Sequence, residues 1–82
     1  MPHTRAHIRF NTTKDVTNFV QQMNSDGSTN KYILENFDGM YRADARSFLG
    51  VMYMFAECND EIYLVNVTKD SEFPFFIDDY RI

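Results

Sequence analysis

The stretch Arg46-Ser47-Phe48-Leu49-Gly50-Val51-Met52 is the part of the sequence that decides the fold. A serine is followed here at once by apolar residues at helix-compatible spacing, and serine is among the residues preferred at the capping position of a helix. The pattern predicts a short helix from Ser47 to Tyr53 or Met54. Gly50 weakens this helix, because glycine in a helix interior costs about 1 kcal/mol relative to alanine.

The apolar side chains of this helix have two interpretations. Apolar residues at helical spacing are more often core than docking surface. A short helix cannot bury all of its sides, however, so we expect at least one of Phe48, Leu49 and Met52 to be exposed.

Upstream of this stretch, the sequence predicts a strand and then a longer helix. Residues 6–10 alternate between apolar and polar side chains, which is typical of a strand with one buried face. Thr12 or Thr13 can cap a helix that runs to about Asn24, and Asp15 completes a capping-box-like arrangement with Thr12. The polar run 24–30 is rich in turn-forming residues and predicts a surface loop.

Two more strand regions and a tail complete the order β-α-β-β-α-β. Residues 32–37 and 40–43 read as a hairpin joined at Asp38-Gly39, a dipeptide that tolerates positive φ. Residues 61–67 are almost continuously β-branched, aromatic or apolar and predict a central strand. In the tail, Pro74 is suited to the first position of a short helix.

Length and charge limit the class of protein. A chain of 82 residues buries only about 60–65% of the surface that its unfolded form exposes, so we expect one domain over residues 1–82. The net charge is −4 and the basic residues are scattered, which argues against nucleic acid as a partner. No stretch approaches the ~20 apolar residues of a membrane span. We therefore expect a soluble, cytoplasmic protein with no membrane partner.

The residue types that carry catalysis are sparse. Cys58 is the one cysteine, and without a neighbouring histidine it is expected to be inert and half-buried. Asp60-Glu61 and Asp78-Asp79 are adjacent acids, which point apart in strands and turns and lack companion ligands. No phosphate-binding glycine loop, nucleophile elbow or Cys/His metal spacing is present. The sequence predicts no enzyme, cofactor or metal site.

Three segments in the right order resemble HPr, the phosphocarrier protein of the bacterial sugar phosphotransferase system. Residues 46–52 match, in character, the K-S-I-M-G-V-M motif that opens the second helix of regulated HPr proteins. Residues 38–45 resemble the family's N-G-K-x-x-x-A hairpin, and residues 19–22 resemble its F-V-x-x segment. The resemblance implies an α+β, two-layer open-faced β-sandwich: a four-stranded, mainly antiparallel sheet with helices on one face and a shortened C-terminal helix.

The chain departs from the family at the phosphorylated loop. Where the family carries G-L-H-A-R-P-A, the corresponding degenerate position holds Thr12, Thr13 and Lys14, with neither the histidine nor the arginine. Lys14 can attract an anion but Asp15 repels one, so ordinary phosphocarrier activity is not expected. The remaining histidines are His3, in the N-terminal tail, and His7, on the polar side of the first strand.

The family's third helix is also missing or cut down. Its loss would uncover the sheet unless aromatic side chains of the tail fold back over it, and otherwise these side chains mark an oligomer interface. They are Phe73, Phe75, Phe76 and Tyr80.

Ser47 has two compatible interpretations. In the first, its hydroxyl caps the helix and contributes about 1 kcal/mol. In the second, which the resemblance implies, an HPr-type kinase phosphorylates Ser47, and the helix dipole together with Arg46 or Arg42 stabilises the phosphate. The resemblance also makes Arg46, Phe48, Leu49 and Met52 the partner-binding residues.

These observations favour a non-catalytic, HPr-like regulatory or protein-binding domain that is switched by phosphorylation at Ser47. Its partners would be an HPr kinase or another phosphotransferase-system or regulatory protein. One alternative is a carrier that uses His3 or His7 in an altered geometry. Another is a degenerate HPr-like scaffold that forms a homodimer through its aromatic tail.

Overall fold

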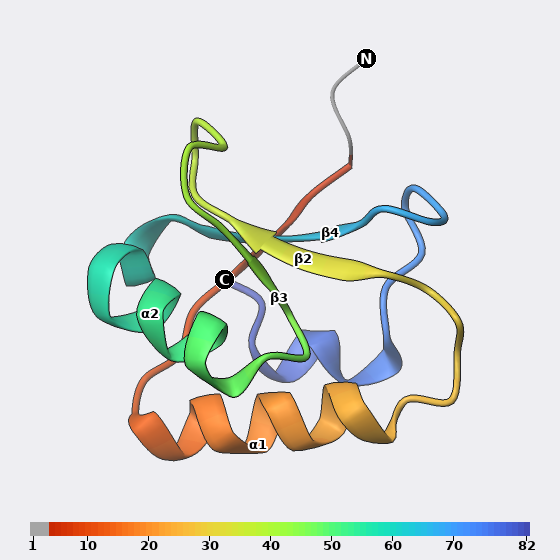
Figure 1. Ribbon diagram of the computed structural model, residues 1–82, viewed down its shortest axis with the longest axis horizontal. Coiled ribbons are helices and arrows are strands. Elements are labelled where there is room, and N and C mark those ends of the chain that lie inside the picture. Colours follow the sequence, from red (N-terminus) through yellow and green to blue (C-terminus); the bar gives the residue numbers. More distant parts are fainter. Residues whose placement is uncertain (1–3) are drawn as a thin grey trace.

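The structure, a computed structural model, describes residues 4–82 and is an α+β fold built on a four-stranded antiparallel sheet (Figure 1). The helices and strands follow one another in the predicted order. They are β1 (Ala6–Ile8), α1 (Thr13–Ser25), β2 (Tyr32–Glu35), β3 (Arg42–Asp44), α2 (Phe48–Cys58) and β4 (Ile62–Asn66), with 3-10 helices η1 (Asn59–Glu61) and η2 (Phe75–Asp79).

The strands lie in the order β1-β4-β2-β3, so β4 is central, as its apolar sequence predicts. Leu64 of β4 lies opposite Ala6 on one side and Leu34 on the other. At the outer edge of β1 the end of the chain adds further pairing: the Arg9 amide donates to the Tyr80 carbonyl, and the Ile82 amide donates to the His7 carbonyl, both at 2.9 Å. One edge of the sheet is therefore covered by the tail.

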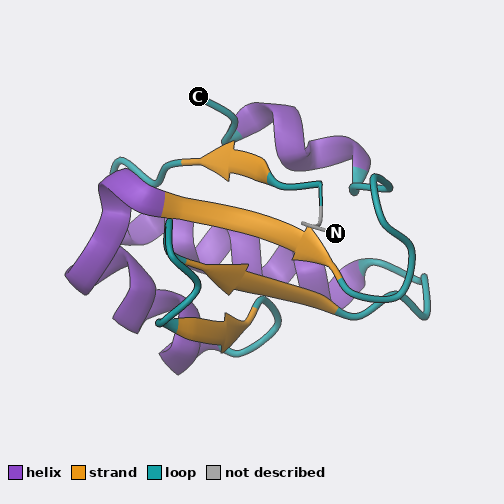
Figure 2. Ribbon diagram, turned by 90° about the horizontal axis from the view of Figure 1, so that it is seen from above, coloured by secondary structure: helices purple, strands orange, loops and turns teal. Residues whose placement is uncertain are grey.

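The helices pack on one face of this sheet, and the strands lie in front of them when the molecule is viewed from above (Figure 2). Strand side chains alternate between the two faces, so every second one enters the core. The core between the layers includes Ile8, Phe10, Val16, Phe19, Met23, Leu34, Val51, Met54, Ile62 and Leu64, none of which is exposed to solvent.

Helix α1 forms where the sequence predicts it. The Thr12 hydroxyl accepts a hydrogen bond from the Asp15 amide at 3.2 Å, and the Asp15 carboxylate accepts one from the Asn11 amide at 2.8 Å. The two side chains thus satisfy amides at the start of the helix, in a variant of the capping box. The four buried positions of α1 are those that the periodicity predicts: Val16, Phe19, Val20 and Met23.

Two predicted boundaries were wrong. The hairpin is not a two-residue turn: β2 ends at Glu35 and β3 begins at Arg42, and the connection is organised by Asn36, whose backbone accepts from the Gly39 amide at 3.1 Å. Helix α2 extends four residues beyond Met54, to Cys58.

The tail forms a 3-10 helix instead of an α-helix, and Pro74 precedes it as the capping residue. Phe76 is buried, and Phe73 and Tyr80 pack against the core. The Tyr80 ring meets Phe19 edge-on at 5.2 Å between centroids. Three of the four aromatic side chains therefore cover the core, while Phe75 is 93% exposed.

Within residues 4–82, no helix has the length and apolar character needed to cross a membrane.

Candidate functional site

Ser47 caps helix α2, as predicted. Its backbone is extended, and its hydroxyl accepts a hydrogen bond from the Gly50 amide at 3.2 Å. The Val51 amide donates to the Ser47 carbonyl at 2.9 Å, which closes the first turn. Ser47 is nevertheless exposed, so its hydroxyl is both a structural cap and accessible from solvent.

Close packing against β3 explains why a glycine stands at position 50 in the helix. A Cβ atom at this position would lie 3.0 Å from the Cβ of Ala43 on β3. The missing side chain lets the start of α2 lie close against β3, and this offsets the poor helix propensity of glycine.

The expected exposure on α2 is present. Leu49 is 78% exposed and Phe48 is 43% exposed, whereas Met52 is only partly exposed and packs against the core. Leu49 and Phe48 therefore offer apolar surface beside the Ser47 hydroxyl, and Met52 contributes mainly to stability.

Other residues extend this surface, and sequence reasoning missed them. Tyr53, 47% exposed, lies one turn after Leu49, and its ring is 6.0 Å from that of Tyr41 in the β2–β3 connection. Met40, beside Tyr41, is also exposed. Only the Leu49–Tyr53 spacing was visible in the sequence, because the contact with Tyr41 depends on the hairpin. We call Tyr41, Phe48, Leu49 and Tyr53 the α2 surface.

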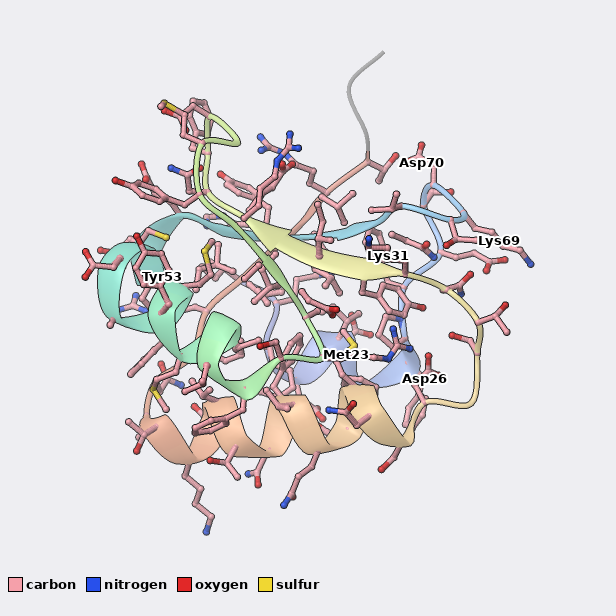
Figure 3. All side chains as sticks on the ribbon, viewed as in Figure 1. Met23, Asp26, Lys31, Tyr53, Lys69 and Asp70 are labelled. Carbon is pink, nitrogen blue, oxygen red and sulfur yellow. The ribbon has the colours of Figure 1, made fainter. Side chains whose placement is uncertain are left out.

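Tyr53 has one acidic neighbour on its own helix, Glu57, four residues further on. The pKa of the Tyr53 hydroxyl is raised, first by partial desolvation and then by Tyr41 and Glu57. Tyr53 lies on the side of the molecule opposite Lys69 and Asp70 (Figure 3).

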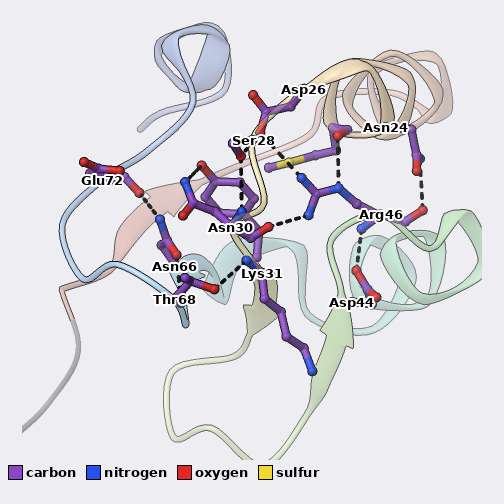
Figure 4. Close-up of polar contacts among 12 residues, drawn as sticks. Asn24, Asp26, Ser28, Asn30, Lys31, Asp44, Arg46, Asn66, Thr68 and Glu72 are labelled. Atoms are coloured by element: carbon purple, nitrogen blue, oxygen red, sulfur yellow. Dashed lines mark hydrogen bonds and ion pairs between the residues drawn. The ribbon is translucent and has the colours of Figure 1, made fainter.

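The Arg46 side chain has a structural role and extends away from Leu49 and Tyr53, toward the end of α1. Its Nη1 donates to the Asn30 carbonyl at 2.8 Å and its Nε to the Met23 carbonyl at 3.2 Å, and the guanidinium pairs with Asp26 at 3.5 Å (Figure 4). It also lies over the Tyr32 ring. Arg46 thus ties α2 to the end of α1 and to the following loop.

Arg42 is likewise engaged elsewhere. Its Nε lies 3.4 Å from the Glu35 carboxylate, which Arg5, the residue before β1, approaches at 3.6 Å. Arg5 also lies over the Tyr63 ring, 4.1 Å from the centroid. These contacts form a polar cluster on the sheet, so Arg42, like Arg46, has partners other than Ser47 in this structure.

The residues that the resemblance places at a degenerate phosphorylation position form the capped start of α1. Thr12 is the cap and Thr13 the first helical residue, and both are exposed, as is Lys14. His7 is stacked on Tyr63 with centroids 4.5 Å apart. His3 lies outside the described residues.

Cys58 is half-buried, as expected. Burial raises the pKa of its thiol, and Glu61 and Glu57 raise it further. A raised pKa leaves less of the reactive thiolate at neutral pH. Within residues 4–82, no three His, Cys, Asp or Glu side chains are grouped so that they could hold a metal ion.

The chain was compared with known protein families, curated proteins and solved structures. No protein-family model, curated protein or solved structure matches the chain.

Proposed function

We propose that this chain is a non-catalytic, HPr-like regulatory domain that binds other proteins through the α2 surface and is switched by phosphorylation at Ser47. One observation carries the proposal. The exposed Ser47 hydroxyl caps α2, and Leu49, two residues later, presents an exposed apolar side chain with Tyr53 one turn further along the helix. Exposed apolar side chains that gather at one place are typical of interaction sites.

A phosphate at Ser47 would act on binding and leave the fold in place. It would bring about −1.5 to −2 charges to the N-terminal end of α2, where unpaired amides and the helix dipole favour an anion. The same charge would stand at the border of the apolar α2 surface and change which partner can dock there. Asp44 opposes the phosphate, since its carboxylate accepts from the Arg46 amide one residue before Ser47.

The HPr-like part of the proposal rests on the matching segments in residues 19–52. It is supported by the element order and by the placing of both α-helices on one face of the antiparallel sheet, which are the features that the resemblance implies. The expected partners are an HPr kinase and a phosphotransferase-system or regulatory protein.

Phosphorylation is tested by two incubations followed by intact-mass measurement. HPr kinase with ATP should add one acid-stable phosphate to the wild-type chain and none to Ser47→Ala. The general phosphotransferase enzyme with phosphoenolpyruvate should add none. An acid-labile phosphate from the second reaction would instead support a histidine carrier, with His7→Ala identifying the acceptor.

Binding through the α2 surface is tested with matched surface variants. Leu49→Ser and Tyr53→Ser should lose a partner that the wild-type chain retains in cross-linking from native cells. Phe75→Ser is the control, because Phe75 on η2 is an apolar residue that is more exposed than either Leu49 or Tyr53. A partner lost equally in all three variants, or retained in all three, would contradict a role of the α2 surface.

A further inference from the structure

Acidic side chains follow the α2 surface toward the C-terminal end of the helix. Glu57 lies in the last turn of α2, and Asp60 and Glu61 lie in η1 directly after it. All three are exposed, and they line an open hollow of about 470 Å³ together with Phe55 and Ala56.

This arrangement is electrostatically unfavourable for the chain alone. The C-terminal end of a helix carries a partial negative charge, and acids placed there are destabilising. The last turn of α2 has no basic residue, and the sequence has no Lys or Arg from residue 47 to residue 68. Arg9 approaches Asp60 to 3.8 Å, but both side chains are more than half exposed, so the pair is screened by solvent. A cation supplied from outside would relieve this repulsion.

The apolar and acidic groups lie along one line of the helix. Leu49, Tyr53 and Glu57 follow each other at intervals of four residues and therefore share one side of α2. At 1.5 Å per residue, Leu49 and Glu57 are separated by about 12 Å along the axis. The surface thus presents an apolar half beside Ser47 and an acidic half at the other end.

We propose that the partner docks a basic amphipathic helix on α2. Its apolar side chains lie on Leu49 and Tyr53, and a Lys or Arg about two turns further along lies against Glu57 and Glu61. This inference rests on the proposed function, and it names the chemistry of the partner. Helix-on-helix docking of an apolar stripe is a common recognition mode, and the complementary charges fix the direction of the bound helix.

The same charges disfavour other occupants. Nucleic acid and anionic membranes would be repelled by Glu57, Asp60 and Glu61. A second copy of this chain that used its own α2 would offer these acids no cation, because residues 47–68 contain no Lys or Arg.

The test uses the full chain and three synthetic helical peptides of 20 residues based on alanine. The first peptide carries two leucines one turn apart and two lysines about two turns further on the same side. The second has glutamates in place of the lysines, and the third has serines in place of the leucines. Binding is followed by ¹H–¹⁵N NMR titration at up to about 1 mM peptide, the range in which weak complexes are detected.

The lysine peptide should bind at least about tenfold more tightly than either of the others and shift the amides of residues 49–61. Glu57→Lys combined with Glu61→Lys should reverse the preference, so that the glutamate peptide binds better. Glu72→Lys is the control variant, because Glu72 lies in the linker before η2, and its binding should match that of the wild-type chain with either peptide.

Three results would overturn the inference: equal affinity for the lysine and glutamate peptides, no binding of the lysine peptide, or shifts confined to the polar cluster around Glu35. Each is distinct from failure of the proposed function. If Leu49→Ser loses the native partner while no peptide preference is seen, the docking function stands and the basic helix is wrong. If Leu49→Ser changes neither the binding of the native partner nor the binding of the lysine peptide, the docking function itself fails.

Discussion

Ser47 contributes to the fold through one hydrogen bond, and that contribution can be separated from any role as a phosphate acceptor. Ser47→Ala removes the acceptor for the Gly50 amide, so we expect the free energy of unfolding to fall by about 1 kcal/mol. Ser47→Asp should keep nearly full stability, because aspartate caps helices as well as serine does and its charge suits the helix dipole. Urea unfolding of the three proteins measures both effects. Equal losses in the two variants would show that capping is not what Ser47 supplies.

The effect of Gly50→Ala on stability should depend on the residue at position 43. Gly50→Ala improves helix propensity by about 1 kcal/mol, but the new Cβ would meet the Ala43 Cβ at 3.0 Å, and overpacking of this kind costs about 1–3 kcal/mol. We expect a net loss of stability in the wild-type background. In Ala43→Gly the closest obstacle is gone and the nearest remaining atom is the Ser47 Oγ at 3.3 Å, so the same substitution should cost less or stabilise. A double-mutant cycle by urea unfolding checks this, and additive effects would contradict the close packing.

Local signals were sufficient for some residues and insufficient for others. The caps Thr12 and Ser47 were predictable because a cap bonds to an amide three residues away. The contacts of Arg46 were not predictable because its partners are the Met23 and Asn30 carbonyls, 23 and 16 residues away. Tyr41 was missed for the same reason, since it reaches Tyr53 only after the hairpin has formed.

At the scale of elements, the two adjacent phenylalanines of η2 differ in their exposure to solvent. Phe76 is 5% exposed and meets the Phe19 ring edge-on, whereas Phe75 is 93% exposed. Phe76→Ala should therefore cost about 3–5 kcal/mol, as is usual for removing a buried ring, and Phe75→Ala should stay within about 0.5 kcal/mol of the wild type. Thermal and urea unfolding measure the difference. Similar losses from both variants would show that η2 does not bury Phe76 as described.

The element order could be predicted from the sequence, while two element ends could not. Strand and helix periodicities are local, so β1, α1 and β4 were found close to their places. Helix α2 was predicted four residues too short, and no local signal marks its true end. Its end is fixed by Asn59, whose side-chain amide donates to the Phe10 carbonyl and whose oxygen accepts from the Phe10 amide, 49 residues away. The hairpin loop depends on Asn36, whose buried side chain accepts from the Tyr41 amide.

For the whole molecule, charge is distributed unevenly between two regions. Arg5 and Arg42 meet around Glu35 on the sheet. The acids of residues 57–61 lie at the end of α2 and η1. A net charge of −4 alone does not reveal this separation, because it depends on which side of the sheet each residue faces. The acids of residues 57–61 are the groups that the proposed basic helix would contact.

The C-terminal tail completes the molecule, and its removal gives a prediction about the whole fold. Deleting residues 74–82 would remove Phe76, Ile77 and Tyr80 from the core and would also remove the amide and carbonyl partners of β1. We expect the shortened chain to lose cooperative unfolding, to bind a dye for exposed apolar surface and to associate through the open edge of β1. Circular dichroism, dye fluorescence and size-exclusion chromatography measure these effects.

The full-length Phe75→Ser variant is the control for this deletion, because it changes the one tail ring that faces solvent and leaves the packing of η2 intact. It should keep the unfolding midpoint of the wild type. If the wild-type chain elutes as a dimer and Phe75→Ser elutes as a monomer, the tail acts as a homodimer interface, as a degenerate scaffold requires. If the shortened chain unfolds cooperatively at the wild-type midpoint, the tail does not cover the core. We expect neither result, because Phe76, Ile77 and Tyr80 close the core between α1 and β1, and an 82-residue domain has little apolar area to spare.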